Sequence, residues 1–108
     1  MKSVEDSLLL DFYGNLLTDK MRLTLEMYLN DDLSLTEIAA EEDISRQGVH
    51  DKVKRGLLQL KEYEVKLGLV KRFLEQKKTI NKAISLMDNN KYDDARVVLS
   101  DLADEIEE

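Results

Sequence analysis

The side chains best suited to binding chemistry form a polar and basic run over residues 45–55. They are Ser45, Arg46, Gln47, His50, Asp51, Lys54 and Arg55. Arginine can read guanine, and glutamine can read adenine, through paired hydrogen bonds in the major groove of DNA. We therefore predict a nucleic-acid-binding surface in which Arg46, Gln47 and His50 face the bases. Lys54 and Arg55 would bind phosphates, which positions a protein without reading sequence.

Two helices joined by a short turn must position this run. Ser34 and Glu37 have the spacing of a capping box, which opens a short helix. The acidic residues 41–43 follow as a polar turn, and Ser45 is placed to cap the helix that carries the run. The positions that would lock the two helices together are apolar: Ile38, Ala39, Ile44, Val49 and Val53. The sequence therefore predicts a helix-turn-helix over residues 34–58.

A structural explanation of the same pattern stays open. Two short helices joined by a turn occur in many helical domains, and any exposed helix start can carry arginine and glutamine. Asp51 is unfavourable beside phosphate and could instead pair with Lys54 or Arg55 within its own helix. The alternative function is a non-enzymatic protein–protein or RNA-associated interaction module, in which the helix-turn-helix is only a scaffold.

Residues typical of catalytic and metal sites are scarce or poorly placed. The chain has no cysteine and one histidine, His50, which excludes a disulfide scaffold, a thiolate zinc site and a histidine-pair site. Its paired carboxylates fall at expected turns and chain ends, without the burial that separates the pKa values of a catalytic pair. We therefore expect no enzyme, no catalytic residue, no cofactor and no metal.

The composition favours an all-α fold. The 108 residues include no proline, only 4 glycines and 36% charged residues, whereas a β-sandwich or barrel needs many more turn residues. No apolar run approaches the roughly 20 residues of a membrane span, and Met1–Asp11 lacks the pattern of a signal peptide. We expect a cytoplasmic protein without a membrane span.

The net charge of −7 is unevenly distributed along the chain. Residues 45–82 carry 11 basic and 4 acidic side chains, while residues 1–44 and 83–108 are strongly acidic. A basic middle segment favours a polyanionic partner, although acidic neighbours could simply neutralise it. The acidic last helix could also cover the basic surface and weaken nucleic-acid binding.

The remaining helices follow from apolar spacing and polar stops. We expect helices over about 4–17 and 19–29, a long helix from Ser45 toward Met87, and an amphipathic helix over about 92–106 that buries Tyr92. Gly56 and Gly68 each weaken a helix by about 1 kcal/mol relative to alanine, so they are the expected bends of the long helix.

Heptad spacing appears within the long helix. The stripe consists of Leu60, Tyr63, Leu67, Val70 and Leu74. It could join two subunits as a homodimer, and helix-turn-helix proteins commonly bind two half-sites as pairs. It could equally pack against the protein's own first and last helices, which also need partners for their apolar faces.

Several segments together resemble a known family. They are Leu16–Lys20, Leu35–Ala39, Ile44–Asp51 and the stretch from Lys54-Arg55 to Tyr63–Leu67. The combination is similar to the YlxM family of small bacterial helix-turn-helix proteins over roughly residues 8–70. The chain departs from that family at Gly48, where alanine is usual, and at Gly56, where a larger residue is usual.

The resemblance implies a sigma-factor-like helix-turn-helix, followed here by a long helix and a C-terminal amphipathic helix. It also implies DNA binding and a regulatory part in the signal recognition particle pathway, with the particle's protein or RNA as a partner. We therefore expect a regulatory protein that binds double-stranded DNA. Residues 1–70 would form the helical domain, and residues 71–108 would be an extension that packs on this domain or on a partner.

Overall fold

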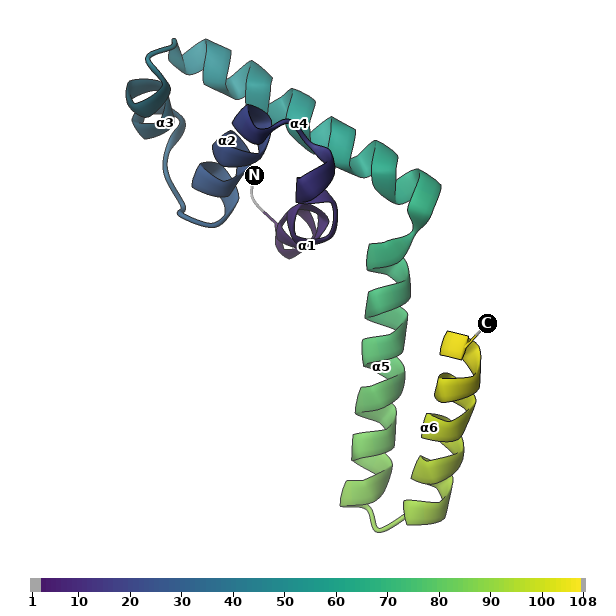
Figure 1. Cartoon of the computed structure of the whole chain (residues 1–108). Coiled ribbons are helices and arrows are strands. Elements are labelled where there is room, and N and C mark those ends of the chain that lie inside the picture. Colours follow the sequence, from purple (N-terminus) through teal and green to yellow (C-terminus); the bar gives the residue numbers. More distant parts are fainter. Residues whose placement is uncertain (1–2, 108) are drawn as a thin grey trace. The chain divides into compact units, whose positions relative to one another are not determined.

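The computed structural model describes residues 3–107, and every regular element in that part of the chain is a helix. The elements are α1 (Val4–Tyr13), the 3₁₀ turn η1 (Gly14–Leu16), α2 (Asp19–Leu29), α3 (Leu35–Glu42), α4 (Arg46–Leu67), α5 (Leu69–Asp88) and α6 (Tyr92–Glu107) (Figure 1). The all-α prediction is confirmed. The chain divides into two compact units, Met1–Val70 and Lys71–Glu108, which are described separately below.

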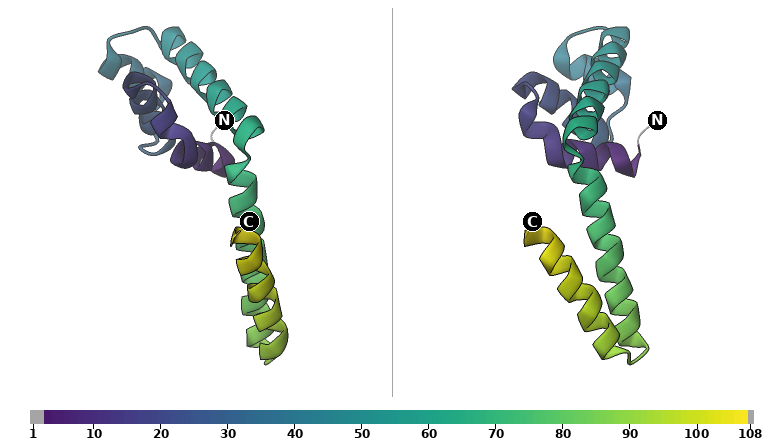
Figure 2. Two further views of the ribbon diagram at one scale, coloured as in Figure 1. Left: turned by 45° about the vertical axis from the view of Figure 1, so that its right-hand side comes forward. Right: turned by 90° about the vertical axis from the view of Figure 1, so that its right-hand side faces the viewer.

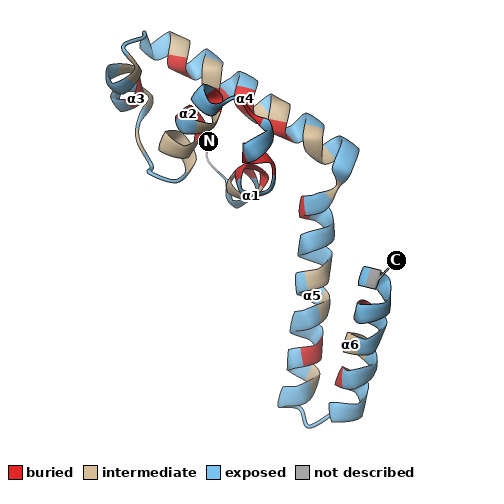
Figure 3. Ribbon diagram, in the orientation of Figure 1, coloured by how far each residue is buried: buried red, intermediate tan, exposed pale blue. Residues whose placement is uncertain are grey.

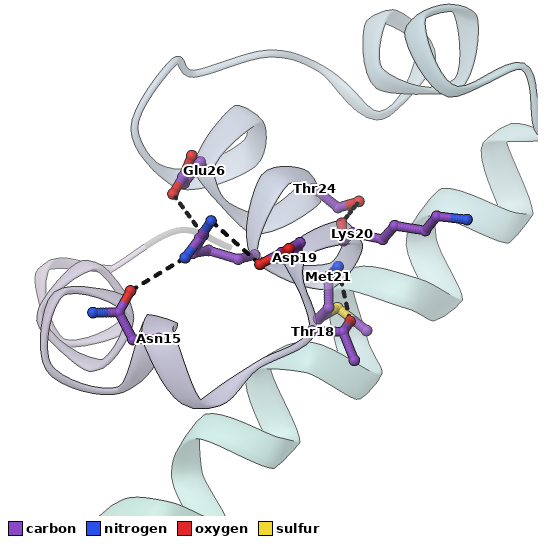
Figure 4. Close-up of polar contacts among 8 residues, drawn as sticks. Asn15, Thr18, Asp19, Lys20, Met21, Thr24 and Glu26 are labelled. Atoms are coloured by element: carbon purple, nitrogen blue, oxygen red, sulfur yellow. Dashed lines mark hydrogen bonds and ion pairs between the residues drawn. The ribbon is translucent and has the colours of Figure 1, made fainter.

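Side-chain caps fix where the first helices begin. The Thr18 hydroxyl accepts a hydrogen bond from the Met21 N–H at the start of α2 (Figure 4). Ser34 and Glu37 form the predicted capping box: the Ser34 Oγ accepts from the Glu37 N–H, and a Glu37 carboxylate oxygen accepts from the Ser34 N–H. Each cap satisfies backbone N–H groups that have no partner within the helix.

The core of the first unit lies where α1, α2 and α3 pack against α4 (Figure 3). Its largest fully buried side chains are Leu9, Tyr13, Thr24, Leu25, Ile38, Val49 and Leu60. The first helix is shorter than predicted, since α1 ends at Tyr13 and the 3₁₀ turn carries the chain to Leu16, which is 53% exposed. This turn redirects the chain, so that α1 and α2 can both contact α4.

Of the two glycines expected to bend the long helix, only Gly68 does so. It has a φ of +63°, ends α4 in the left-handed conformation and is followed directly by α5. Glycine adopts this conformation without steric cost. Gly56 lies inside an unbroken α4 and is buried, and a Cβ built there would lie 2.6 Å from the Met21 Sδ. Gly56 therefore permits close packing of α4 on α2, and its prediction as a bend is wrong.

The heptad stripe, for which a homodimer contact and packing within the chain were both open, is largely used inside the first unit. Leu60 and Val70 are buried in its core, and Tyr63 packs against that core and donates its hydroxyl to the Leu16 carbonyl oxygen over 3.2 Å. Only Leu67 and Leu74 of the five remain exposed. The stripe therefore does not form a continuous surface for a second subunit.

In the second unit, α5 and α6 form an antiparallel hairpin joined by the turn 89–91, and the two helices separate with distance from the turn in the right-hand view of Figure 2. Ala83, Ala95 and Leu102 are its buried apolar residues among those the structure describes. The helix predicted to end near Ile106 is confirmed as α6. The prediction that Tyr92 is buried is wrong, because its side chain is 62% exposed at the first position of α6.

Candidate nucleic-acid interface

A tight turn connects α3 to α4. Asp43 has a φ of +56° and ends α3 in the left-handed conformation, and the N–H groups of Asp43 and Ile44 both donate to the Ala39 carbonyl oxygen. Ser45 then caps α4, its Oγ accepting from the Gly48 N–H over 2.9 Å. Only residues 43–45 separate the two helices, and the predicted N-cap at Ser45 is confirmed.

Apolar packing fixes the inner side of this helix pair. Ile38 on α3 is fully buried, and so is Val49 one turn into α4; Val53, a further turn along, is 5% exposed. All three belong to the core of the first unit. Because the inner side of α4 is fixed in this way, the opposite side of its first three turns is held toward solvent.

A polar cluster also ties α2, α3 and α4 together, and sequence analysis did not identify it. The Lys52 Nζ lies 3.0 Å from Glu42 Oε2, and the two side chains are only 21% and 17% exposed. The fully buried Thr24 hydroxyl donates to the other oxygen of the Glu42 carboxylate. Glu42 was assigned to a polar turn, whereas it is the last residue of α3. There a carboxylate is unfavourable for the helix dipole unless a cation compensates it.

The predicted reading residues on the first three turns of α4 are open to solvent. Arg46, Gln47, His50, Lys54 and Arg55 are exposed. Among the described residues, the side chains of Arg46, Lys54 and Arg55 form no ion pair or hydrogen bond, so their donors remain available. Arg22 and Lys52, by contrast, form ion pairs within the first unit.

Arg22 lies on α2 and has partners on both sides. Its guanidinium lies 3.5 Å from carboxylate oxygens of both Asp19 and Glu26 and donates to Asn15 Oδ1 over 3.2 Å (Figure 4). These contacts connect η1 to α2 and neutralise the charge of Arg22. Lys52 is likewise occupied by Glu42. The unpaired cations of the helix-turn-helix therefore gather at the start of α4.

Asp51 has different partners from those predicted. Its Oδ1 accepts a hydrogen bond from the Gln47 Nε2 over 3.0 Å and lies 3.5 Å from the His50 Nδ1. The expected pair with Lys54 or Arg55 does not form in this structure. Asp51 therefore orients the first reading residues and occupies one donor of Gln47, while both sides of the contact stay exposed.

The chemistry available at this surface is recognition through hydrogen bonds and charge. Within residues 3–107, no group of three or more His, Asp or Glu side chains could hold a metal ion. Nor is any helix in this range long and apolar enough to cross a membrane. The exposed arginine, lysine and amide donors fit an acceptor-rich anionic partner.

Comparison with known proteins agrees with this architecture. A family model described as "UPF0122: Putative helix-turn-helix protein, YlxM / p13 like" matches residues 1–104. A UPF0122 protein of Acetivibrio thermocellus is 52% identical over 86 residues, which cover 80% of this chain and 71% of the relative. One from Caldanaerobacter subterraneus is 57% identical over 76 residues, covering 70% and 65%. One from Bacillus mycoides is 43% identical over 91 residues, covering 84% and 83%.

Proposed function

This chain belongs to the UPF0122 family of YlxM / p13-like helix-turn-helix proteins, and from that premise we propose that it is a regulatory protein that binds duplex DNA without catalysing a reaction. The reading surface consists of the Ser45 N-cap and the first three turns of α4. Its members are Ser45, Arg46, Gln47, His50, Asp51, Lys54 and Arg55.

One observation carries this proposal. Arg46, Lys54 and Arg55 are exposed and unpaired on the first three turns of α4, whose inner side is fixed by buried packing and by the Glu42–Lys52 contact. In a helix-turn-helix, the start of the second helix enters the major groove. A rigidly held helix start loses little conformational freedom on binding, which favours affinity.

The residues divide into two roles in this arrangement. Arg46 and Gln47, in the first turn, would contact base edges, where arginine reads guanine and glutamine reads adenine. His50 follows one turn later and would also face the bases. Lys54 and Arg55, in the third turn, would bind phosphates and set the register of the helix in the groove. This division resembles the promoter-reading domain of sigma factors.

Signal recognition particle RNA is the second ligand worth testing, because the family resemblance implies a link to that pathway. A-form RNA has a deep and narrow major groove that side chains cannot read. A protein that uses this surface on RNA would therefore contact phosphates, with little dependence on Arg46. The favoured ligand remains duplex DNA, because the two residues nearest the helix start are the side chains that best read bases.

The experiment is a salt series of binding to duplex DNA, with binding to signal recognition particle RNA measured in parallel. Preferred DNA sites are first selected from random duplexes with the wild-type protein. We expect Lys54→Ala to shallow the dependence of log affinity on log salt by about one unit, since it removes one phosphate contact. Arg46→Ala should relax the sequence preference at one base pair, with a loss of about 1–3 kcal/mol on the selected site.

Lys66→Ala is the matched control. Lys66 is also an exposed cation of α4, but it lies roughly 30 Å along the helix from Arg46. It should leave both the salt slope and the sequence preference unchanged. Equal effects of Lys54→Ala and Lys66→Ala, or no binding to either nucleic acid at low salt, would overturn the proposal. The helix-turn-helix would then serve as the scaffold of a protein-interaction module.

A further inference from the structure

The second unit leaves much of its apolar surface uncovered. On α5, Ile80, Ile84 and Met87 are 43%, 49% and 38% exposed. On α6, Tyr92 and Ile106 are 62% and 60% exposed. Isolated exposed apolar side chains are normal, whereas several on one face mark an interaction surface.

Helix geometry places these side chains on one broad face of the pair. At about 100° per residue, Ile80, Ile84 and Met87 fall within about 60° of one another, to one side of the buried Ala83. Tyr92 and Leu99 are offset from the buried Ala95 in the same rotational sense. Because α5 and α6 run antiparallel, equal offsets point to the same side of the pair. We call this surface the hairpin face: Ile80, Ile84, Met87, Tyr92, Leu99 and Ile106.

Two helices alone cannot bury such a face. Stable α-helical domains have at least two packed layers around one core, and chains below about 40 residues usually need oligomerisation or a cross-link. The second unit spans Lys71–Glu108, with three buried apolar residues in its described part, two of them alanines. The chain has no cysteine that could cross-link the pair.

We propose that the hairpin face binds the same face of a second copy of this chain, forming a four-helix bundle. The two helices carry opposite net charges, which favours a second copy of the chain as the partner. Residues 71–88 carry five basic and two acidic side chains, while residues 92–107 carry one basic and six acidic. A two-fold axis parallel to the helices lays α5 of each copy over α6 of the other, so opposite charges meet twice.

The same arrangement pairs the apolar side chains. Residues of α5 and α6 that lie equally far from the turn 89–91 are level with each other, and an axis parallel to the helices keeps them level between copies. Ile80 then meets Leu99 of the second copy, and Met87 meets Tyr92. The four helices form a closed bundle of the ordinary antiparallel kind.

The test is the mass of the full-length chain in solution across a concentration series, measured by sedimentation equilibrium. We expect a reversible monomer–dimer equilibrium. Ile84→Glu places a carboxylate in each half of the contact and should weaken dimerisation by about tenfold or more. Val97→Glu is the matched control: Val97 is 59% exposed on α6 but points away from the hairpin face, so its substitution should leave the dissociation constant within about threefold of the wild type.

Circular dichroism tests whether Ile84→Glu unfolds the helices, since the variant should keep the helicity of the wild type if it acts on association alone.

A second pair of variants tests the orientation of the two copies. Lys77 and Asp104 are exposed and lie about equally far from the turn 89–91. At about 100° per residue, both point away from the neighbouring helix of their own copy. Lys77→Glu should weaken the dimer, and adding Asp104→Lys should restore it. A wild-type chain that stays monomeric at its highest soluble concentration, or Val97→Glu weakening association as much as Ile84→Glu, would overturn the proposal.

Discussion

The phenol of Tyr13 and the carboxylate of Glu64 lie 2.5 Å apart, and together they cap the first turn of α5. The Leu69 N–H donates to the Tyr13 hydroxyl, and the Val70 N–H donates to Glu64 Oε1, both over 3.0 Å. Gly68 precedes α5 and has no side chain that could accept these bonds, as serine or threonine would at an N-cap. A residue of α1 therefore supplies the cap of a helix that begins more than 50 residues later.

We expect Tyr13→Phe to lower the free energy of unfolding of the first unit by about 1–2 kcal/mol, because it removes one buried hydrogen bond to a carboxylate and leaves the Leu69 N–H without its acceptor. Urea unfolding followed by circular dichroism measures this change. Tyr92→Phe is the control, since that hydroxyl bonds Asn90 at the exposed start of α6 and should cost less than about 0.5 kcal/mol. Equal costs for both variants would show that the cap on α5 contributes nothing.

Alkaline pH should destabilise the first unit through the same group. Burial raises the pKa of Tyr13 above its ordinary value of 10.0, and the hydrogen bond and negative charge of Glu64 raise it further. The folded state therefore holds this proton more tightly than the unfolded state. The contribution to stability is complete below pH 10 and is lost as the pH rises above it toward the higher folded pKa. Urea unfolding should show a steeper loss above pH 10 for the wild type than for Tyr13→Phe, and parallel losses would contradict this.

The contact between Glu42 and Lys52 should stabilise the helix-turn-helix. Lys52→Met leaves the largely buried Glu42 carboxylate without its cation, which should cost about 1–3 kcal/mol in urea unfolding. Adding Glu42→Gln removes the unpaired charge, so the double variant should lose less than the sum of the two single changes. Lys54→Met controls for the loss of a lysine, because Lys54 is exposed and should change stability by less than about 0.5 kcal/mol. Strict additivity would show that the two charges do not interact.

Local signals in the sequence were sufficient for the helix starts and for the helix-turn-helix. Ser34 and Glu37 act within one turn of each other, and so do Ser45 and the Gly48 N–H, so neither cap depends on the rest of the fold. The exposure of Lys54 and Arg55 also followed from the period of the helix, because the apolar positions of α4 fix its inner side. Arg46 lies three residues before Val49 and shares its side of the helix, so its exposure comes from its position in the first turn of α4. Which nucleic acid they contact stays a prediction.

Contacts between distant segments could not be predicted from local sequence signals. Tyr13 and Glu64 are 51 residues apart, and Thr24 and Glu42 are 18 apart, so nothing in their neighbouring residues indicates the pairing. The two glycines of the long helix illustrate the same limit. Gly56 and Gly68 carry equal helix penalties in the sequence, but one meets α2 closely and the other ends a helix. Only the packing of α4 on α2 distinguishes them.

The close approach at Gly56 yields a stability prediction. Alanine gains about 1 kcal/mol of helix propensity, but its Cβ would lie 2.6 Å from the Met21 Sδ and 3.0 Å from the Leu25 Cδ1. Overpacking of this kind costs about 1–3 kcal/mol, so Gly56→Ala should be destabilising overall in thermal or urea unfolding. In a Met21→Ala background the closest contact is gone, and Gly56→Ala should be less costly or stabilising. The same cost in both backgrounds would show that Met21 does not restrict this position.

Asp51 provides a test of the reading surface that works in the opposite direction to the loss of a cation. Its carboxylate lies among the proposed phosphate- and base-binding residues and holds one donor of Gln47. If that surface binds duplex DNA, Asp51→Ala should raise the affinity several-fold at low salt, because it removes a repulsive charge and frees the Gln47 amide. Glu62→Ala is the matched control: it removes the same charge from an exposed position of α4 roughly 16 Å farther along the helix, and should change the affinity by much less.

Filter binding or fluorescence anisotropy on one duplex at several salt concentrations measures the affinity of both variants. An equal rise for the two would show that only net charge matters, and a fall for Asp51→Ala would show that the carboxylate holds Gln47 and His50 in the orientation that DNA requires.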